Sequence, residues 1–128
     1  MHLDLEQMKQ AVVAALEDVK AKDIQVLDVS KLTPLFDCMI IASGDSNRQV
    51  KALINNVVVK LKEKGATVYG IEGEQTGEWA LVDLGDVVVH VMQPAVRQYY
   101  NLEQLWGATE ARLPANAGGA KPRKGDES

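Results

Sequence analysis

The sequence holds few of the residues that build disulfide or metal sites. Its 128 residues include one cysteine, Cys38, and two histidines, His2 and His90. One thiol excludes an internal disulfide framework and a thiolate metal cluster, and the two histidines match no recognised metal-ligand spacing. We therefore expect no metal or other cofactor, and a reducing, cytoplasmic setting.

Positive charge and long apolar runs are also scarce. Lys and Arg number 14 against 18 Asp and Glu, a formal net charge of −4. This balance argues against a protein that grips nucleic acid through a broad basic surface. No apolar stretch approaches the ~20 residues that span a bilayer, and Asp4 and Glu6 stand where a signal peptide would be basic. We expect a soluble intracellular protein whose partner is another protein, with no membrane contact and no direct sequence-specific binding of nucleic acid.

What the sequence does contain is sufficient for one folded domain. Hydrophobic residues make up 46% of the chain and charged residues 25%, which predicts a single domain with its own core over residues 1–106. From Gly107 the composition changes to Ala, Gly, Pro, Lys and Glu without periodicity. That change predicts a disordered tail over 107–128.

Hydrophobic spacing predicts two long helices and about five strands. The helices are expected over residues 4–21 and 46–65, with capping boxes at Asp4/Gln7 and Ser46/Gln49. Strands are expected over 24–29, 37–43 and 67–71 and in a hairpin over 77–92, followed by a short helix or pair of turns from Pro94 through Trp106. This order predicts an α/β fold with a mixed sheet of about five strands and both long helices on one face.

The hairpin segment GEWALVDLGDVVVHVM sorts its side chains onto two different faces. With Gly85-Asp86 as a two-residue turn, Trp79 faces Met92 across the strands. Period two then places only small or branched aliphatics on one face. The other face carries Trp79, Leu81, Asp83, Val88, His90 and Met92. Two interpretations stay open: this second face is exposed for a partner, or the last helix, with Tyr99, Tyr100, Leu102 and Trp106, folds over it as ordinary core.

Other patterns could carry chemistry, and each has a structural explanation. Cys38 and His90 could form a thiolate and its base, although a lone cysteine in an apolar strand is usually an inert packed thiol. The turn 43–46 precedes a helix and could hold phosphate, but Ser46 as an N-cap explains it. The glutamates at 72, 74 and 78 suit a solvated acidic loop. We expect no catalytic residue; a divergent nucleotide- or phosphate-handling enzyme and a plain homodimerisation module are the alternatives.

Three separated motifs carry a resemblance to a known family. DCMIIASGDSNRQVKAL, GEWALVDLGDVVVHVM and RQYYNLEQLW together resemble the ribosomal silencing factor family, also called Iojap-related, over about residues 4–106. The resemblance implies a nucleotidyltransferase-like α/β fold without the catalytic carboxylates. It also implies binding to protein fourteen of the large ribosomal subunit, a steric block to joining of the small subunit, and repression of translation when nutrients are limited. Family members form homodimers in solution, and dimerisation could hide the same surface.

The resemblance also assigns site residues. Its GEWALVDLG segment places the partner contact at Trp79, Leu81 and Asp83. The cross-strand register adds Val88, His90 and Met92 to that surface. The closing motif adds Tyr99, Tyr100, Leu102 and Trp106, either touching the partner or bracing the hairpin from behind.

Overall fold

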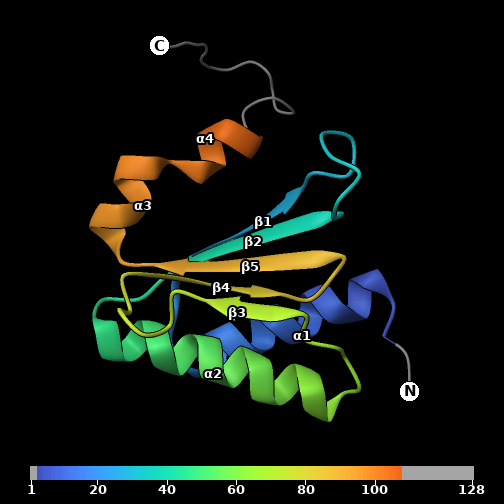
Figure 1. The fold of residues 1–128 in the computed structure, drawn as a ribbon, viewed down its shortest axis with the longest axis horizontal. Helices are drawn as coiled ribbons and strands as arrows, with labels where there is room; N and C mark the ends of the chain where they lie inside the picture. Colours follow the sequence, from blue (N-terminus) through green and yellow to red (C-terminus); the bar gives the residue numbers. More distant parts are fainter. Residues whose placement is uncertain (1–2, 108–128) are drawn as a thin grey trace.

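The computed structural model describes residues 3–107 as an α/β fold (Figure 1). The elements, in chain order, are α1 Leu5–Asp18, β1 Lys22–Asp28, β2 Cys38–Ser43, α2 Asn47–Glu63, β3 Gly70–Glu72, β4 Trp79–Asp83, β5 Val87–Met92, α3 Pro94–Tyr100 and α4 Leu102–Gly107. The tail predicted over 107–128 lies outside the described residues, except that Gly107 ends α4. Within residues 3–107, no helix has the length and hydrophobicity needed to cross a membrane.

The strands form one open mixed sheet, as predicted. Their order is β1-β2-β5-β4-β3. β2 and β5 are parallel, and the other neighbouring strands are antiparallel. Every residue of β2 is buried, so this strand is covered on both faces. β5, the last strand in the sequence, is the middle strand of the sheet.

The hairpin of β4 and β5 has the predicted register. Trp79 pairs with Met92, and Asp83 pairs with Val88. The turn depends on Gly85, whose φ of 90° lies in a region that glycine enters without steric penalty. The Leu84 N–H donates to the Val87 carbonyl oxygen at 2.9 Å, which closes the turn, and the Gly85 N–H donates to Asp83 Oδ1 at 2.8 Å. Because this turn sets the register, it also decides which side chains share a face of the sheet.

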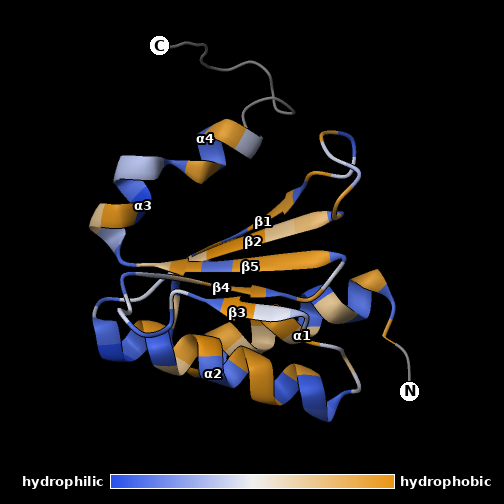
Figure 2. Cartoon of the chain, viewed as in Figure 1, coloured by the Kyte–Doolittle hydropathy of each residue, from blue (hydrophilic) through white to orange (hydrophobic). Residues whose placement is uncertain are grey.

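Helices α1 and α2 cover the same face of the sheet (Figure 1). This confirms the expected placement of the two long helices. Both mix hydrophobic and hydrophilic residues (Figure 2), as expected for helices with one side against a sheet. The main core between these helices and the sheet includes Val12, Leu16, Ile40, Leu53, Val57, Val82 and Val89.

The N-terminal caps of the two helices differ from each other. Asp4 and Gln7 form the predicted reciprocal capping box of α1. Ser46 caps α2 by accepting from the Gln49 N–H at 3.1 Å. The predicted return hydrogen bond of this capping box, from the Ser46 N–H to the Gln49 side chain, is wrong. Gln49 Oε1 instead accepts from the Asp45 N–H at 2.7 Å. The Gln49 amide also donates to the carbonyls of residues 19 and 20, so this side chain links the start of α2 to the end of α1.

Two strands differ from their predicted bounds. β3 spans Gly70–Glu72, shorter and later than the predicted 67–71, because its ladder to β4 begins where Gly70 pairs with Asp83. β1 begins at Lys22, two residues before the predicted start. Its register to β2 shifts between Lys22 and Gln25, where Asp23 has a φ of 52°. This irregularity explains the imperfect alternation of hydrophobic residues in the segment.

Helices α3 and α4 lie on the other side of the sheet (Figure 1). Pro94 is the first residue of α3, where its fixed φ and missing N–H suit a helix start. Asn101 adopts the left-handed conformation and separates the two helices. The sequence predicted a short helix or a pair of turns from Pro94 through Trp106, and the structure has two short helices there.

Candidate functional site

The site is the side of β4 and β5 that faces away from α1 and α2. We call it the hairpin face, and it carries Trp79, Leu81, Asp83, Val88, His90 and Met92. The sequence places all six on one side, because their positions alternate with those of the main core. Trp79, Leu81, Asp83 and Val88 are half-buried, whereas His90 and Met92 are buried.

The Trp79 ring is held in place by contacts from two elements. Its Nε1–H donates to His90 Nδ1 at 3.0 Å. Tyr100 of α3 packs against the indole with ring centroids 4.8 Å apart. Residues 79 and 90 are diagonal neighbours in the hairpin register, within reach for aromatic side chains. The indole is therefore presented in one orientation rather than as a free surface ring.

His90 accepts this hydrogen bond as a neutral imidazole. The side chain is 8% exposed, and burial lowers the pKa of His90 from 6.5 to about 4. With Nδ1 as the acceptor, the remaining proton of the neutral ring is on Nε2. At neutral pH the imidazole thus acts as a fixed acceptor that orients Trp79.

The lowered pKa of His90 predicts a pH-dependent free energy of unfolding. Between pH 6.5 and 4 the unfolded chain binds a proton at His90 that the folded chain does not. Stability should therefore fall as the pH drops through this window, by up to about 3 kcal/mol from this group. Urea unfolding of the wild type and of His90→Gln at pH 7.5, 6 and 5 tests this. We expect the glutamine variant, which keeps an acceptor for Trp79, to lose less stability on acidification; equal losses would contradict the assignment.

Helices α3 and α4 cover part of the sheet on this side. Met92 is 0% exposed and belongs to a second core with Val29, Met39 and Ile41. Residues of the two helices packed against that core are Val96, Leu102 and Trp106. Of the two interpretations left open by the sequence, cover by the last helical segment therefore holds for the part over β1 and β2. A short amphipathic pair of helices covers it, and Met92 supports the hairpin face from within.

A buried arginine fixes the two short helices to the sheet. Arg97 of α3 is 9% exposed, and its Nη1 donates to Ser43 Oγ of β2 at 2.8 Å. Its Nε and Nη2 donate to Glu103 Oε2 of α4 at 2.9 and 2.6 Å. The guanidinium therefore links β2, α3 and α4. Removing it would leave the half-buried Glu103 without its cation and the buried Ser43 without its donor, which should destabilise the fold.

The closing aromatic residues divide into two groups. Leu102 and Trp106 are half-buried and pack on the second core. The ring centroids of Trp106 and Phe36 are 5.8 Å apart. Tyr99 is 81% exposed and Tyr100 54% exposed, with their rings edge to face at 5.0 Å. Thus the first group braces the sheet, and the tyrosines extend the accessible aromatic surface beside Trp79.

Sequence reasoning missed the positioning contacts around this surface. Arg97, the donor to Ser43, was not among the expected site residues, and the partner roles of His90 and Tyr100 toward Trp79 were not foreseen. A signal for Arg97 was available, because it is the only cation in the segment from Pro94 through Trp106. Its partner Ser43 is too distant in the sequence for spacing to reveal it.

The structure separates the residues of the alternative chemical sites. Cys38 lies in the main core, and His90 lies on the opposite face of the sheet, so the two cannot act as a thiolate and its base. Burial also raises the pKa of the Cys38 thiol to about 11, which keeps it protonated at neutral pH. In the turn before α2, the hydroxyls of Ser43 and Ser46 are engaged by Arg97 and the Gln49 N–H. The glutamates at 72, 74 and 78 are exposed.

The fold and the site define a small α/β domain with an accessible apolar sheet face that the short helices α3 and α4 support. The family model described as "Ribosomal silencing factor during starvation" matches residues 2–127. The chain therefore belongs to the ribosomal silencing factor family.

Individual relatives agree with this assignment. A Chromobacterium violaceum protein named "Ribosomal silencing factor RsfS" is 57% identical over 120 residues, covering 94% of this chain and 97% of the relative. A crystal structure of a Chromobacterium violaceum protein matches with a TM-score of 0.81 at 55% identity, covering 94% of this chain and 92% of that one. The mouse protein "Mitochondrial assembly of ribosomal large subunit protein 1" is 35% identical over 98 residues, 74% of this chain and 43% of its own length. The silencing factor names describe a regulatory role.

Proposed function

We propose that this protein docks its hairpin face on protein fourteen of the large ribosomal subunit and thereby prevents the small subunit from joining. In this mechanism it represses translation in the cytoplasm when nutrients are limited. It acts by occupying space, so it needs a rigid surface and enough bulk, and no catalytic group. The family membership and the name of the mouse relative, which refers to the large subunit, support this setting.

The observation that carries the proposal is the accessible apolar centre of a rigid sheet. Leu81 and Val88 are half-buried on neighbouring strands, and Trp79 is fixed beside them by His90 and Tyr100. Aromatic anchors that are held rigid bind partners at a low entropic cost. The surface is ready for docking without rearrangement.

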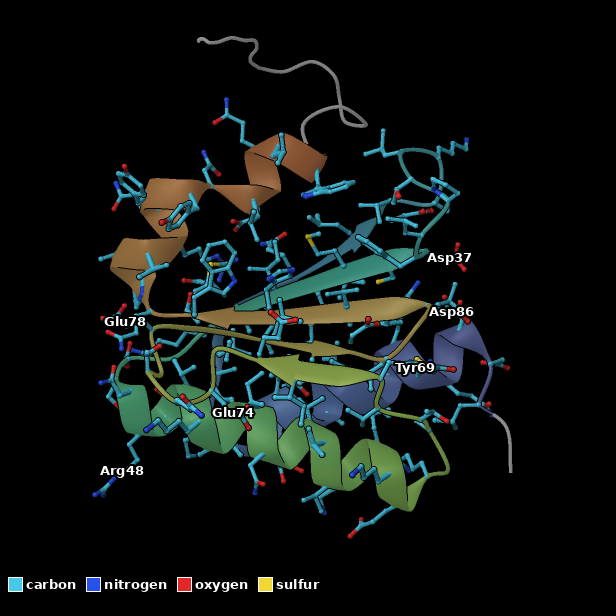
Figure 3. The ribbon with its side chains drawn as sticks, viewed as in Figure 1. Asp37, Arg48, Tyr69, Glu74, Glu78 and Asp86 are labelled. Atoms are coloured by element: carbon cyan, nitrogen blue, oxygen red, sulfur yellow. The ribbon has the colours of Figure 1, made fainter. Side chains whose placement is uncertain are left out.

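Charge around this surface favours a basic protein partner. Asp83 lies on the hairpin face, and Glu72 pairs with Leu81 from the edge strand β3. Glu78, the exposed residue directly before β4, adds a further carboxylate at the end of this surface (Figure 3). Exposed carboxylates around an apolar centre steer a cationic surface and disfavour acidic ones. A basic ribosomal protein fits this pattern.

The free energy gained by burying the apolar side chains of the hairpin face is too small to support a complex alone, so the contact must include residues outside the strands. Completing the burial of Trp79, Leu81 and Val88 stabilises a complex by roughly 3 to 4 kcal/mol, which is below or near the cost of association, about 4 to 15 kcal/mol. Tyr99 and Tyr100 lie beside Trp79 and are exposed. We infer that they add to the contact.

The same surface gives a prediction about the free protein. We propose that it forms a homodimer that buries the hairpin face against its own copy, and that ribosome binding dissociates the dimer. Analytical ultracentrifugation with and without large subunits distinguishes this regulated dimer from a permanent one. A dimer that stays intact while bound would contradict the shared surface.

The direct test of the function combines binding with subunit joining. Purified large subunits are pelleted with the protein, and small subunits are then added while light scattering reports formation of whole ribosomes. We expect the protein to pellet with large subunits, not with small ones, and to reduce joining in proportion to the bound fraction. Joining that proceeds normally on fully occupied large subunits would overturn the blocking mechanism.

A further inference from the structure

Positive charge in this acidic protein is concentrated on one helix. Residues 47–64, which are α2 and its C-cap, carry five cationic side chains and one carboxylate, Glu63. The other described residues through 106 carry five cationic and fourteen anionic side chains. Although the net charge of the chain is −4, helix α2 is cationic and the rest of the domain is strongly anionic.

Helix stability explains only part of this concentration. Lys60 and Lys62 lie in the last turn of α2, where cations interact favourably with the helix dipole. Arg48 lies in the first turn, where a cation is unfavourable and which holds no acidic residue, and Lys51 follows in the next turn. The two are also three positions apart, so their like charges repel. Folding thus disfavours this pair.

The pair also faces solvent without a counter-charge. Arg48, Lys51 and Lys62 are exposed and lie on one side of α2, opposite the side formed by Val50 and Val57. Arg48 points away from the rest of the protein (Figure 3). The ion pairs within residues 3–107 involve Lys9, Lys22 and Arg97, and none includes a cation of α2. The row extends along the helix for roughly 21 Å at 1.5 Å per residue.

We propose that the outer side of α2 is an RNA-binding surface whose cations contact backbone phosphates. A row of unpaired cations on a helix complements the regular negative charge of a nucleic-acid backbone and reads no sequence. The inference rests on the proposed function for the identity of the RNA, which is ribosomal RNA next to the docking position. Because α2 lies on the face of the sheet opposite the hairpin face (Figure 1), the protein contacts phosphate and protein fourteen at the same time.

Salt-dependent binding of a defined RNA tests this surface. A fluorescein-labelled RNA hairpin is titrated with the wild type, with the double variant Arg48→Gln/Lys51→Gln, and with the control Lys9→Gln/Lys31→Gln. The control removes the same charge from α1 and from the loop after β1. We expect the slope of log affinity against log salt to fall by about 1.4 to 1.8 in the double variant only. Between 50 and 200 mM salt the wild type would then lose roughly 7- to 12-fold more affinity than the double variant.

The outcomes separate this inference from the proposed function. A wild type that pellets with large subunits but does not bind the RNA hairpin, or equal slopes for both variants, would overturn the RNA surface and leave the function intact. RNA binding that depends on α2 in a protein that fails to pellet with large subunits would support the surface and refute the function. Weaker pelleting of the double variant with unchanged RNA binding would identify an acidic protein as the contact and overturn the inference.

Thermal unfolding gives a second, independent measurement. If Arg48 and Lys51 serve binding rather than folding, their replacement leaves the melting temperature unchanged or raises it, because an unfavourable interaction with the helix dipole is removed. A clear drop in melting temperature would show that the two side chains support the fold, and would count against the proposal.

Discussion

Replacing Leu81 with arginine is expected to abolish association with the large ribosomal subunit while leaving the protein folded. Leu81 is at the centre of the hairpin face, pairs with His90 across the strands, and lies outside both cores. Docking would bury a guanidinium, and remove an apolar side chain, at a contact whose partner we propose to be basic. We expect a loss of at least ~3 kcal/mol, or more than ~100-fold in affinity.

Co-sedimentation with purified large subunits over a range of protein concentrations measures this loss. Leu35→Arg is the matched control, because Leu35 is 80% exposed in the loop between β1 and β2 and lies away from the hairpin face. The control should pellet like the wild type, and circular dichroism should show both variants folded. Normal pelleting of Leu81→Arg would remove the hairpin face from the proposed interface.

The milder variant Trp79→Ala should weaken the same association by about 2 kcal/mol, roughly 30-fold. It removes the anchor ring but also removes the donor to His90 and the packing against Tyr100. Some stability is therefore lost as well, and the melting temperature must be measured together with binding. Binding equal to that of the wild type would show that the indole serves the fold alone.

Among the glycines of the described residues, Gly73 is the one whose replacement by alanine is expected to cause the largest loss of stability. Gly73 has a φ of 79°, and a Cβ there would lie 2.0 Å from the Trp79 carbonyl oxygen and 3.1 Å from Ala80 Cα. Both are backbone atoms of β4, so no flexible side chain can move aside. We expect a destabilisation of at least ~3 kcal/mol, which lowers the melting temperature by roughly 12 °C or more.

The neighbouring glycine of the same region provides the control. A Cβ at Gly70 meets no atom within 4 Å, and Gly70 is not among the positive-φ glycines. Gly70→Ala should be neutral or stabilise the protein by up to about 1 kcal/mol, because it reduces the freedom of the unfolded chain. Differential scanning calorimetry of the two variants compares them directly. Similar melting temperatures would show that the loop before β4 yields easily and does not fix the position of Trp79.

Local rules were sufficient to predict the hairpin and its two faces. Gly85-Asp86 can supply only a short turn, and once Trp79 is paired with Met92 the alternation of strands determines every other partner. The same reasoning could have found the contact between Trp79 and His90, since diagonal neighbours follow from the register. The helix caps at Asp4 and Ser46 were also local and were found.

The cover over the second core could not be derived in this way. Helices α3 and α4 have seven and six residues, too few for their apolar side to show a clear period. What places them is the Arg97 contact to Ser43, between residues 54 positions apart. Such a contact forms only when the sheet is folded, so the spacing of residues in the sequence cannot predict it. For this reason sequence reasoning placed Met92 on the accessible surface, whereas it is buried.

The central position of β5 has a consequence for when the protein becomes active. β1 pairs only with β2, and β3 only with β4, so each side of the sheet is a separate ladder until β5 joins them. Because β5 is the last strand to be synthesised, a growing chain cannot close the sheet before Met92 has left the exit tunnel, and pairing between such distant segments is slow. A chain that still lacks β5 therefore has neither the closed sheet nor the hairpin face that we propose for docking.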